Sequence, residues 1–72
     1  MKQLVLEEAK KLGFFSQLDE ENIWQILPQR QGATWKLSAT NSRWILSLKN
    51  IPQLYLDSKE AIAFLTMQAR SR

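Results

Sequence analysis

The side chains that most often carry out chemistry in proteins are scarce in this chain of 72 residues, which contains no histidine and no cysteine. Without them, the usual ligands for zinc, copper and haem are missing, and neither a Ser-His-Asp triad nor a Cys-His pair can form. The two glycines, Gly13 and Gly32, lie too far apart to build a glycine-rich loop around a phosphate. We therefore expect no catalytic residues, no bound metal and no cofactor.

The acidic residues have structural explanations in the sequence. Asp19, Glu20 and Glu21 are consecutive, and at the start of a helix they would complement the positive end of its dipole. Asp57 and Glu60 stand three residues apart, as in the reciprocal capping box that opens a helix. No carboxylate remains that needs a catalytic role, so the chain is predicted not to be an enzyme.

Length and composition predict one folded domain over residues 1–72. Hydrophobic residues make up 44% of the chain and charged residues 24%, a balance typical of globular proteins. The net charge of +3 permits an anionic partner without requiring one. No signal peptide is evident, and no apolar run approaches the ~20 residues that span a bilayer. We therefore expect a cytoplasmic protein that does not contact membranes.

Residues 2–12 have the spacing of a helix. Its apolar side chains recur every three or four positions, and they are Met1, Val5, Ala9 and Leu12, with Leu4 beside them. Glu7 and Lys11 are placed to pair on the outer side. Gly13 follows the last apolar position, where a left-handed cap is expected.

A second helix is predicted over residues 17–27, with Ser16 as its N-cap. Its apolar stripe consists of Ile23, Ile26 and Leu27, and Trp24 lies off this stripe. Pro28 would end the helix, because the residue before a proline is pushed out of the helical region.

Residues 34–49 predict a β-hairpin, because polar and apolar residues alternate strictly in two runs. If the chain folds back at Asn41–Ser42, every apolar residue on one face meets another: the pairs are Ala39 with Trp44, Leu37 with Leu46, and Trp35 with Leu48. A slip of one residue would break all three pairs, so the pattern predicts the register as well as the strands.

A third strand is predicted over residues 53–56, after a turn through residues 50–52. Leu48 would then pair with Leu54, and Leu46 with Leu56. A last helix would follow, with a buried stripe of Ala61, Ile62, Phe64, Leu65 and Ala69, and a tail over about residues 69–72 that frays. The predicted fold is thus an α+β two-layer sandwich in the order α-α-β-β-β-α, a three-stranded antiparallel meander with helices on one face.

The order of the last four predicted elements, with Ser58-Lys59-Glu60-Ala61 opening the final helix, resembles the outline of the double-stranded RNA-binding domain. Three strands followed by a helix are also similar in outline to the AP2 domain. The first resemblance would imply phosphate contacts at the start of the last helix. The chain is assigned to neither family, because Lys59 is the single lysine there and no glycine precedes it.

The uncovered face of the predicted sheet carries all the candidate functional residues except Trp24, which belongs to the predicted second helix. One hypothesis is a non-catalytic protein-interaction module or adaptor that binds another protein or forms a homodimer. Its contact residues would be Ile45 and Tyr55, which a merely solvated sheet face explains least well, and Trp24 of the predicted second helix. The other interpretation of Trp24 is that it packs at the edge of the core against Phe14 or Phe15. The alternative is a weak nucleic-acid-binding domain, in which Lys36, Arg43 and Lys49 contact phosphates and Tyr55 stacks on bases. A merely solvated face would also be polar, so the pattern leaves these readings open.

Overall fold

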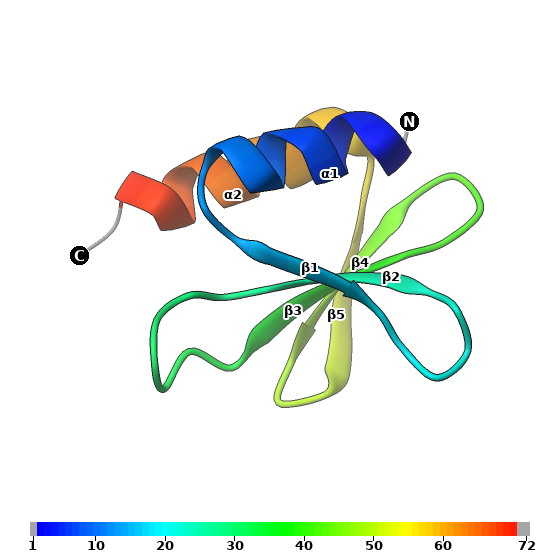
Figure 1. Cartoon of the computed structure of the whole chain (residues 1–72). Coiled ribbons are helices and arrows are strands. Elements are labelled where there is room, and N and C mark those ends of the chain that lie inside the picture. The colour runs from blue at the N-terminus through cyan, green and yellow to red at the C-terminus, as the bar shows by residue number, and fades with distance from the viewer. Residues whose placement is uncertain (1, 71–72) are drawn as a thin grey trace.

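The computed structural model describes residues 2–70 and arranges them as a helix, five strands and a second helix (Figure 1). The helices are α1 (Lys2–Lys11) and α2 (Ser58–Arg70), and the strands are β1 (Phe15–Leu18), β2 (Trp24–Leu27), β3 (Trp35–Ala39), β4 (Trp44–Leu48) and β5 (Ile51–Leu56). The strands form one antiparallel sheet in chain order. Both helices lie on the same face of this sheet, and no helix of residues 2–70 covers the opposite face (Figure 1).

The predicted order α-α-β-β-β-α is wrong, because the segment predicted as a second helix forms β1, β2 and the turn between them. Asp19 closes this turn: its Oδ1 accepts the backbone N–H of Glu21 at 2.8 Å and that of Ile23 at 2.9 Å. Asn22 has a φ of 63°, a left-handed conformation that asparagine tolerates well. Asp19, the first residue of the acidic run, therefore closes a hairpin turn, and Ser16 lies within β1 rather than at the start of a helix.

The predicted hairpin between β3 and β4 is confirmed in its register. Its pairs are Trp35 with Leu48, Leu37 with Leu46, and Ala39 with Trp44. The Oγ1 of Thr40 accepts the backbone N–H of Arg43 at 2.9 Å and closes the loop between the strands. Strict alternation predicts strands well here because one face of both strands is buried under the helices.

The predicted turn and register of the next strand are wrong. The turn consists of Lys49 and Asn50, whose φ values of 52° and 68° suit a two-residue hairpin turn. A register shift between Leu46 and Ser47 then places Leu54 opposite Leu46, where the prediction had paired it with Leu48. Leu56 lies opposite Trp44 for the same reason.

The predicted left-handed cap of helix α1 at Gly13 is confirmed, since this residue has a φ of 89°. The N–H of Gly13 donates to the carbonyl of Lys10 and that of Phe14 to the carbonyl of Ala9, the two hydrogen bonds of a Schellman motif. The predicted pairing of Glu7 with Lys11 is replaced by an ion pair between Lys11 and Glu8 at 3.5 Å. Of the predicted stripe, Val5 and Ala9 are buried, Leu12 is half-buried, Leu4 is exposed, and Met1 lies outside the described residues.

The predicted capping box at the start of α2 is confirmed. The N–H of Asp57 donates to Oε1 of Glu60 at 2.9 Å, and the N–H of Glu60 donates to Oδ1 of Asp57 at 2.8 Å. The predicted stripe is buried at Ala61 and Leu65, half-buried at Ile62 and Phe64, and exposed at Ala69. Of the tail predicted to fray, residues 69 and 70 end α2, and residues 71 and 72 lie outside the described part of the chain.

The hydrophobic core lies between the sheet and the two helices. Val5 of α1, Leu65 of α2, and Ile26 and Leu37 of the sheet are fully buried. The indole of Trp35 makes edge-to-face contacts with Phe14 and Phe64, at centroid distances of 5.6 and 5.0 Å. The apolar face is not sealed along its whole length, since 45% of Leu48 and 56% of Leu54 remain exposed near the β4–β5 turn. Within residues 2–70, no helix is long and apolar enough to cross a membrane.

Candidate functional site

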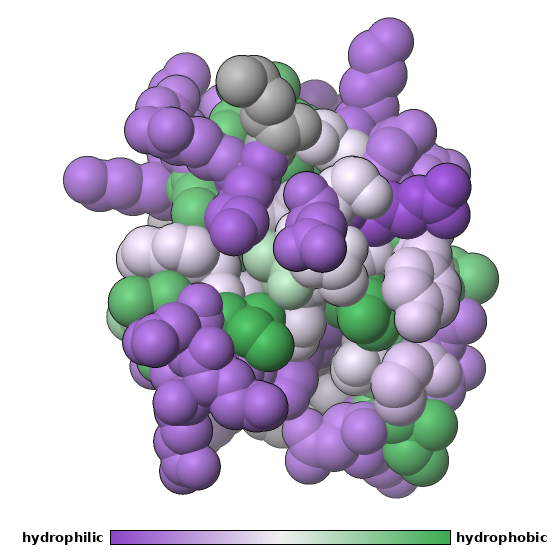
Figure 2. All heavy atoms as spheres, turned by 90° about the vertical axis from the view of Figure 1, so that its right-hand side faces the viewer, coloured by the Kyte–Doolittle hydropathy of each residue, from purple (hydrophilic) through white to green (hydrophobic). Residues whose placement is uncertain are grey.

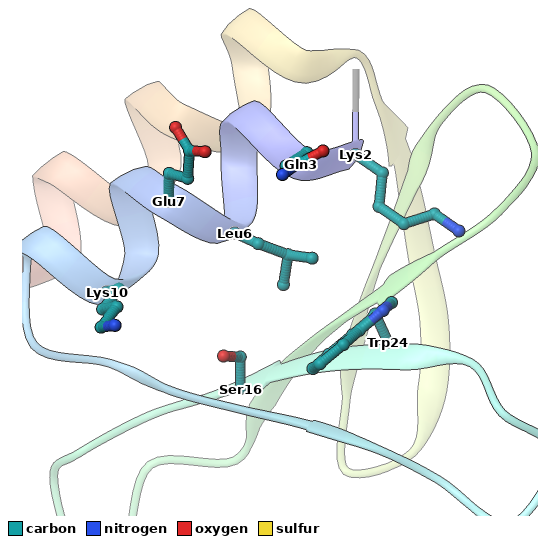
Figure 3. Close-up of a pocket in the computed structure, with 7 residues that line it drawn as sticks. All are labelled: Lys2, Gln3, Leu6, Glu7, Lys10, Ser16 and Trp24. Atoms are coloured by element: carbon teal, nitrogen blue, oxygen red, sulfur yellow. The ribbon is translucent and has the colours of Figure 1, made fainter.

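A surface groove of about 670 Å³ lies between α1 and the first two strands. Its lining comes from one side of α1 and from the sheet beneath it: Lys2, Gln3, Leu6, Glu7, Lys10, Ser16 and Trp24 (Figure 3). The α1 residues recur at intervals of one, three or four, the spacing of one helix face. The groove is therefore built by the packing of α1 across β1 and β2.

The apolar part of the groove consists of Leu6 and Trp24. Leu6 points from α1 toward the strands, where the indole of Trp24 lies (Figure 3). Trp24 shares the helix-covered face of the sheet with Ile26, which pairs with core residue Leu37. Trp24 is half-buried and packs against the core, so its ring is held in place while part of it faces the groove. Leu18, directly opposite Trp24 in β1, is 49% exposed and extends the apolar surface.

The charged part of the groove is predominantly basic. Lys2 and Lys10 stand eight positions apart on α1, and both are exposed. Among the described residues, the ion pair that forms is that of Lys11 with Glu8, so neither groove lysine has an acidic partner within residues 2–70. The carboxylate of Glu7 points away from the sheet (Figure 3). The groove therefore offers two cations to a ligand that lies along it.

Strand β1 is an edge of the sheet, and its outer side lies next to the groove. The N–H of Asp19 donates to the carbonyl of Ile23, which makes these two residues a hydrogen-bonded pair with β2. Because hydrogen-bonded pairs alternate along an antiparallel ladder, Gln17 also bonds toward β2. The backbone N–H and C=O groups of Ser16 and Leu18 consequently point outward, to the side where no strand of the described chain pairs.

The uncovered face of the sheet brings together two of the three residues predicted to contact a partner. Ile45 of β4 and Tyr55 of β5 are directly opposite each other. Ile45 is half-buried, whereas 63% of Tyr55 is exposed. Trp24 lies on the opposite, helix-covered face. The predicted partner-binding residues therefore belong to two separate surfaces.

The cations of the predicted nucleic-acid site are spread along the β3–β4–β5 part of the sheet. The Nζ of Lys36 donates to Oδ1 of Asn50 at 3.3 Å, which ties this side chain to the β4–β5 turn. Lys49 belongs to the same turn, whereas Arg43 closes the loop at the other end of β4. Six positions along a strand separate Arg43 from Lys49, about 20 Å in extended chain. The three cations therefore do not form a compact cluster.

The groove was missed at the level of the sequence, and a specific signal was available. The prediction of a helix over residues 17–27 placed Trp24 on a helix surface and left no strand edge beside it. Ile23, Trp24 and Ile26 are β-branched or aromatic and favour strands, and Asp19 followed by Asn22 is typical of a turn. Lys2 and Lys10 of α1 line a groove only because β1 and β2 lie beneath the helix.

The end of the molecule that carries the β1–β2 and β3–β4 turns has a mixed surface. In Figure 2, hydrophilic residues project around its rim, and the visible hydrophobic residues form small separate groups. Within residues 2–70, no group of three or more histidine, cysteine, aspartate or glutamate side chains is placed to hold a metal ion. The groove and the Ile45–Tyr55 pair are therefore the surfaces on which a function can be argued.

Comparison with protein-family models, with curated proteins and with solved structures finds no match for this chain.

Proposed function

We propose that this chain is a non-catalytic protein-interaction module and that the groove between α1 and β1–β2 is its contact surface. The observation that carries the proposal is Trp24, a large aromatic side chain that is packed against the core on one side and faces the groove on the other. Tryptophan is among the residues that contribute most to binding energy at protein interfaces.

The surroundings of Trp24 support this role. An indole that is already half-buried loses little side-chain freedom when a partner covers the rest of it, so less of the binding energy is spent on ordering the side chain. Leu6 and Leu18 add aliphatic surface around it, and Lys2 and Lys10 form a polar border. An apolar centre with a charged rim is the usual composition of a protein interface.

The proposal is tested by cross-linked pull-down from native extract with nuclease treatment, using the wild-type chain and two variants. Trp24→Thr removes the indole but keeps a residue that favours a strand. Tyr55→Ala is the matched control, because it removes an exposed aromatic ring from the opposite face. A protein that the wild type and Tyr55→Ala capture, and that folded Trp24→Thr does not, supports the proposal. Equal capture by Trp24→Thr, or capture that nuclease abolishes, contradicts it.

A second candidate function is weak binding of single-stranded nucleic acid on the uncovered face. The observation that favours it is Tyr55, a residue that is 63% exposed on the face that also carries Lys36. An exposed aromatic ring stacks on any base, and nearby cations contact the backbone. If about three phosphates of a single strand are contacted, the logarithm of the affinity falls with the logarithm of salt concentration at a slope of about −2.

Lys36→Gln tests this second candidate against Lys59→Gln, which removes the same charge from α2. We expect Lys36→Gln to weaken oligonucleotide binding and to reduce the salt slope by about one. An equal effect of Lys59→Gln would show attraction by net charge alone, without a site on the uncovered face.

A further inference from the structure

We propose that the groove binds an extended segment of another protein, which adds to the free edge of β1 as a sixth strand and carries the pattern acidic–x–apolar–x–acidic. The inference rests on the proposed function, because it names the kind of partner that the groove takes. It depends on three features of the described chain: the backbone of β1, the spacing of residues on α1, and the charge of the groove.

The backbone of β1 supplies the hydrogen bonds. The N–H and C=O groups of Ser16 and of Leu18 point away from β2, as the ladder of the β1–β2 hairpin requires. Addition of a strand to an exposed sheet edge is a common way to bind peptides, in which main-chain hydrogen bonds supply affinity and side-chain pockets supply specificity. The side chains of Ser16 and Leu18 lie on the groove side of the sheet, so an added strand would run beside the groove.

The spacing on α1 matches that of an extended chain. Lys2, Leu6 and Lys10 stand four positions apart, which separates neighbours by about 6 Å along the helix. Alternate residues of a strand point to the same side and are about 6.6 Å apart. Three successive groove-facing side chains of an added strand would therefore meet a cation, a leucine and a second cation in turn.

The chemistry of these three positions specifies the segment. Leu6 and Trp24 offer an apolar contact at the centre of the groove, which suits one aliphatic side chain (Figure 3). Lys2 and Lys10 have no acidic partner among the described residues, so carboxylates two positions before and after the aliphatic residue complement them. Because these lysines are exposed, the charges contribute more to the choice of partner than to affinity.

The two edge strands of the sheet, β5 and β1, differ in their ability to pair with an added strand. In β5, Pro52 pairs with Ser47, whose own backbone bonds toward β3, so Pro52 faces the outer edge and offers no N–H there. A register shift also disrupts the ladder next to it. β1 has the sequence Phe-Ser-Gln-Leu and contains neither a proline nor a register shift.

The sequence of β1 also favours a different protein, and not a second copy of this chain, as the partner. A second copy of this chain would present its own β1, which has no carboxylate within the strand to pair with Lys2 or Lys10. The proposal therefore commits to a segment of another protein, and pairing between two copies becomes an outcome of the test.

The test uses the full chain and a synthetic peptide with capped ends. The peptide has the sequence Thr-Glu-Thr-Ile-Thr-Glu-Thr, which places glutamate, isoleucine and glutamate at alternate positions. We expect NMR titration to shift the amide signals of β1 and the indole signal of Trp24. N-methylation of the peptide backbone on the edge that faces β1 should weaken binding at least tenfold. A lysine-for-glutamate peptide should bind more weakly to the wild type and more tightly to the double variant Lys2→Glu/Lys10→Glu.

Variants at Ser16 separate strand addition from other contacts. Ser16→Pro removes an outward N–H while leaving the bonds to β2, as Pro52 does at the other edge, and should weaken the peptide at least tenfold. Ser16→Ala keeps the N–H and should bind as the wild type does. Thermal melting checks that both variants fold, and the N-methylated peptide gives the same answer without any change in the chain.

Any of three outcomes of the peptide and sedimentation experiments would overturn the inference: equal binding by folded Ser16→Pro and Ser16→Ala, shifts confined to the uncovered face, or a concentration-dependent dimer that the peptide does not disturb. A captured protein that requires Trp24 but is indifferent to Ser16→Pro would leave the proposed function standing and refute strand addition.

Discussion

Asp19→Ala should destabilise the domain by about 1–2 kcal/mol, because Asp19 holds the turn between β1 and β2. Its Oδ1 accepts the backbone N–H groups of Glu21 and Ile23, and its Oδ2 accepts Nε2 of Gln25 at a longer 3.3 Å. A net hydrogen bond contributes about 0.5–1.5 kcal/mol, and the bond to Glu21 counts toward the low end because it is exposed. For a chain of this length, each kcal/mol corresponds to roughly 4–8 °C in the melting temperature.

The matched control is Asp19→Asn, which keeps the Oδ1 acceptor and places another good turn residue at the same position. We expect it to cost less than about 0.5 kcal/mol. Urea unfolding, followed by the fluorescence of the buried Trp35 and Trp44, measures both variants. The midpoint should fall for Asp19→Ala at an unchanged slope. If Asp19→Ala were as stable as the wild type, or if Asn were as costly as Ala, the role assigned to the turn would be wrong.

Three further predictions concern the core, the glycines and self-association. Trp44→Ala should cost about 3–5 kcal/mol in urea unfolding because Trp44 is only 2% exposed, whereas Tyr55→Ala, at 63% exposure, should change stability by less than about 1 kcal/mol. Gly13→Ala and Gly32→Ala both force alanine to a φ near 90°, so each should cost about 1–2 kcal/mol in urea unfolding. A Cβ at Gly13 would clash only with Nε2 of Gln29, the end of an exposed side chain that can turn away, and at Gly32 it would meet no described atom within 4 Å, so the two costs should be similar. If copies of the chain associate through the uncovered face, sedimentation across a concentration range should show a dimer that Ile45→Lys abolishes and Lys59→Gln leaves intact.

The parts of the fold that the sequence predicted correctly are those in which the local sequence pattern is compatible with only one kind of secondary structure. The β3–β4 hairpin has a strict alternation of period two over both strands, and no helical reading of it is possible. The capping box of Asp57 and Glu60 and the cap at Gly13 are likewise local, since each depends on residues within one or two turns of a helix.

The β1–β2 hairpin could not be predicted with the same certainty, because two rules competed over it. Acidic residues after Ser16 and a proline at position 28 are typical of helix ends, and Ile23, Ile26 and Leu27 also have helical spacing. In the structure, pairing with β3 decides the outcome: Ile26 lies opposite Leu37 and is fully buried. Such tertiary pairing overrides local propensity, and the sequence of a single segment does not contain it.

The error in β5 has a different cause. A turn at Lys49–Asn50 requires two consecutive residues at positive φ, a conformation that asparagine adopts readily and lysine seldom does. The alternation of the strand also breaks at the bulge, so that Ile51 and Leu54 fall on the helix-covered side although they are three positions apart. A bulge shifts the face of every later residue, and period-two reasoning cannot find its position.

The candidate site depends on the turn between β1 and β2, which was not predicted from the sequence. By reversing the chain at Asp19, the fold places Leu18 opposite Trp24 and leaves Ser16 on the outermost strand, with α1 above both. The helix that was predicted for this segment would have satisfied its backbone internally and offered a partner only side chains. The hairpin keeps a row of outward-facing N–H and C=O groups beside an indole and two lysines. The proposed recognition of an extended segment therefore depends on the β1–β2 hairpin and α1 together, because the hairpin supplies the free backbone groups and α1 supplies the lysines.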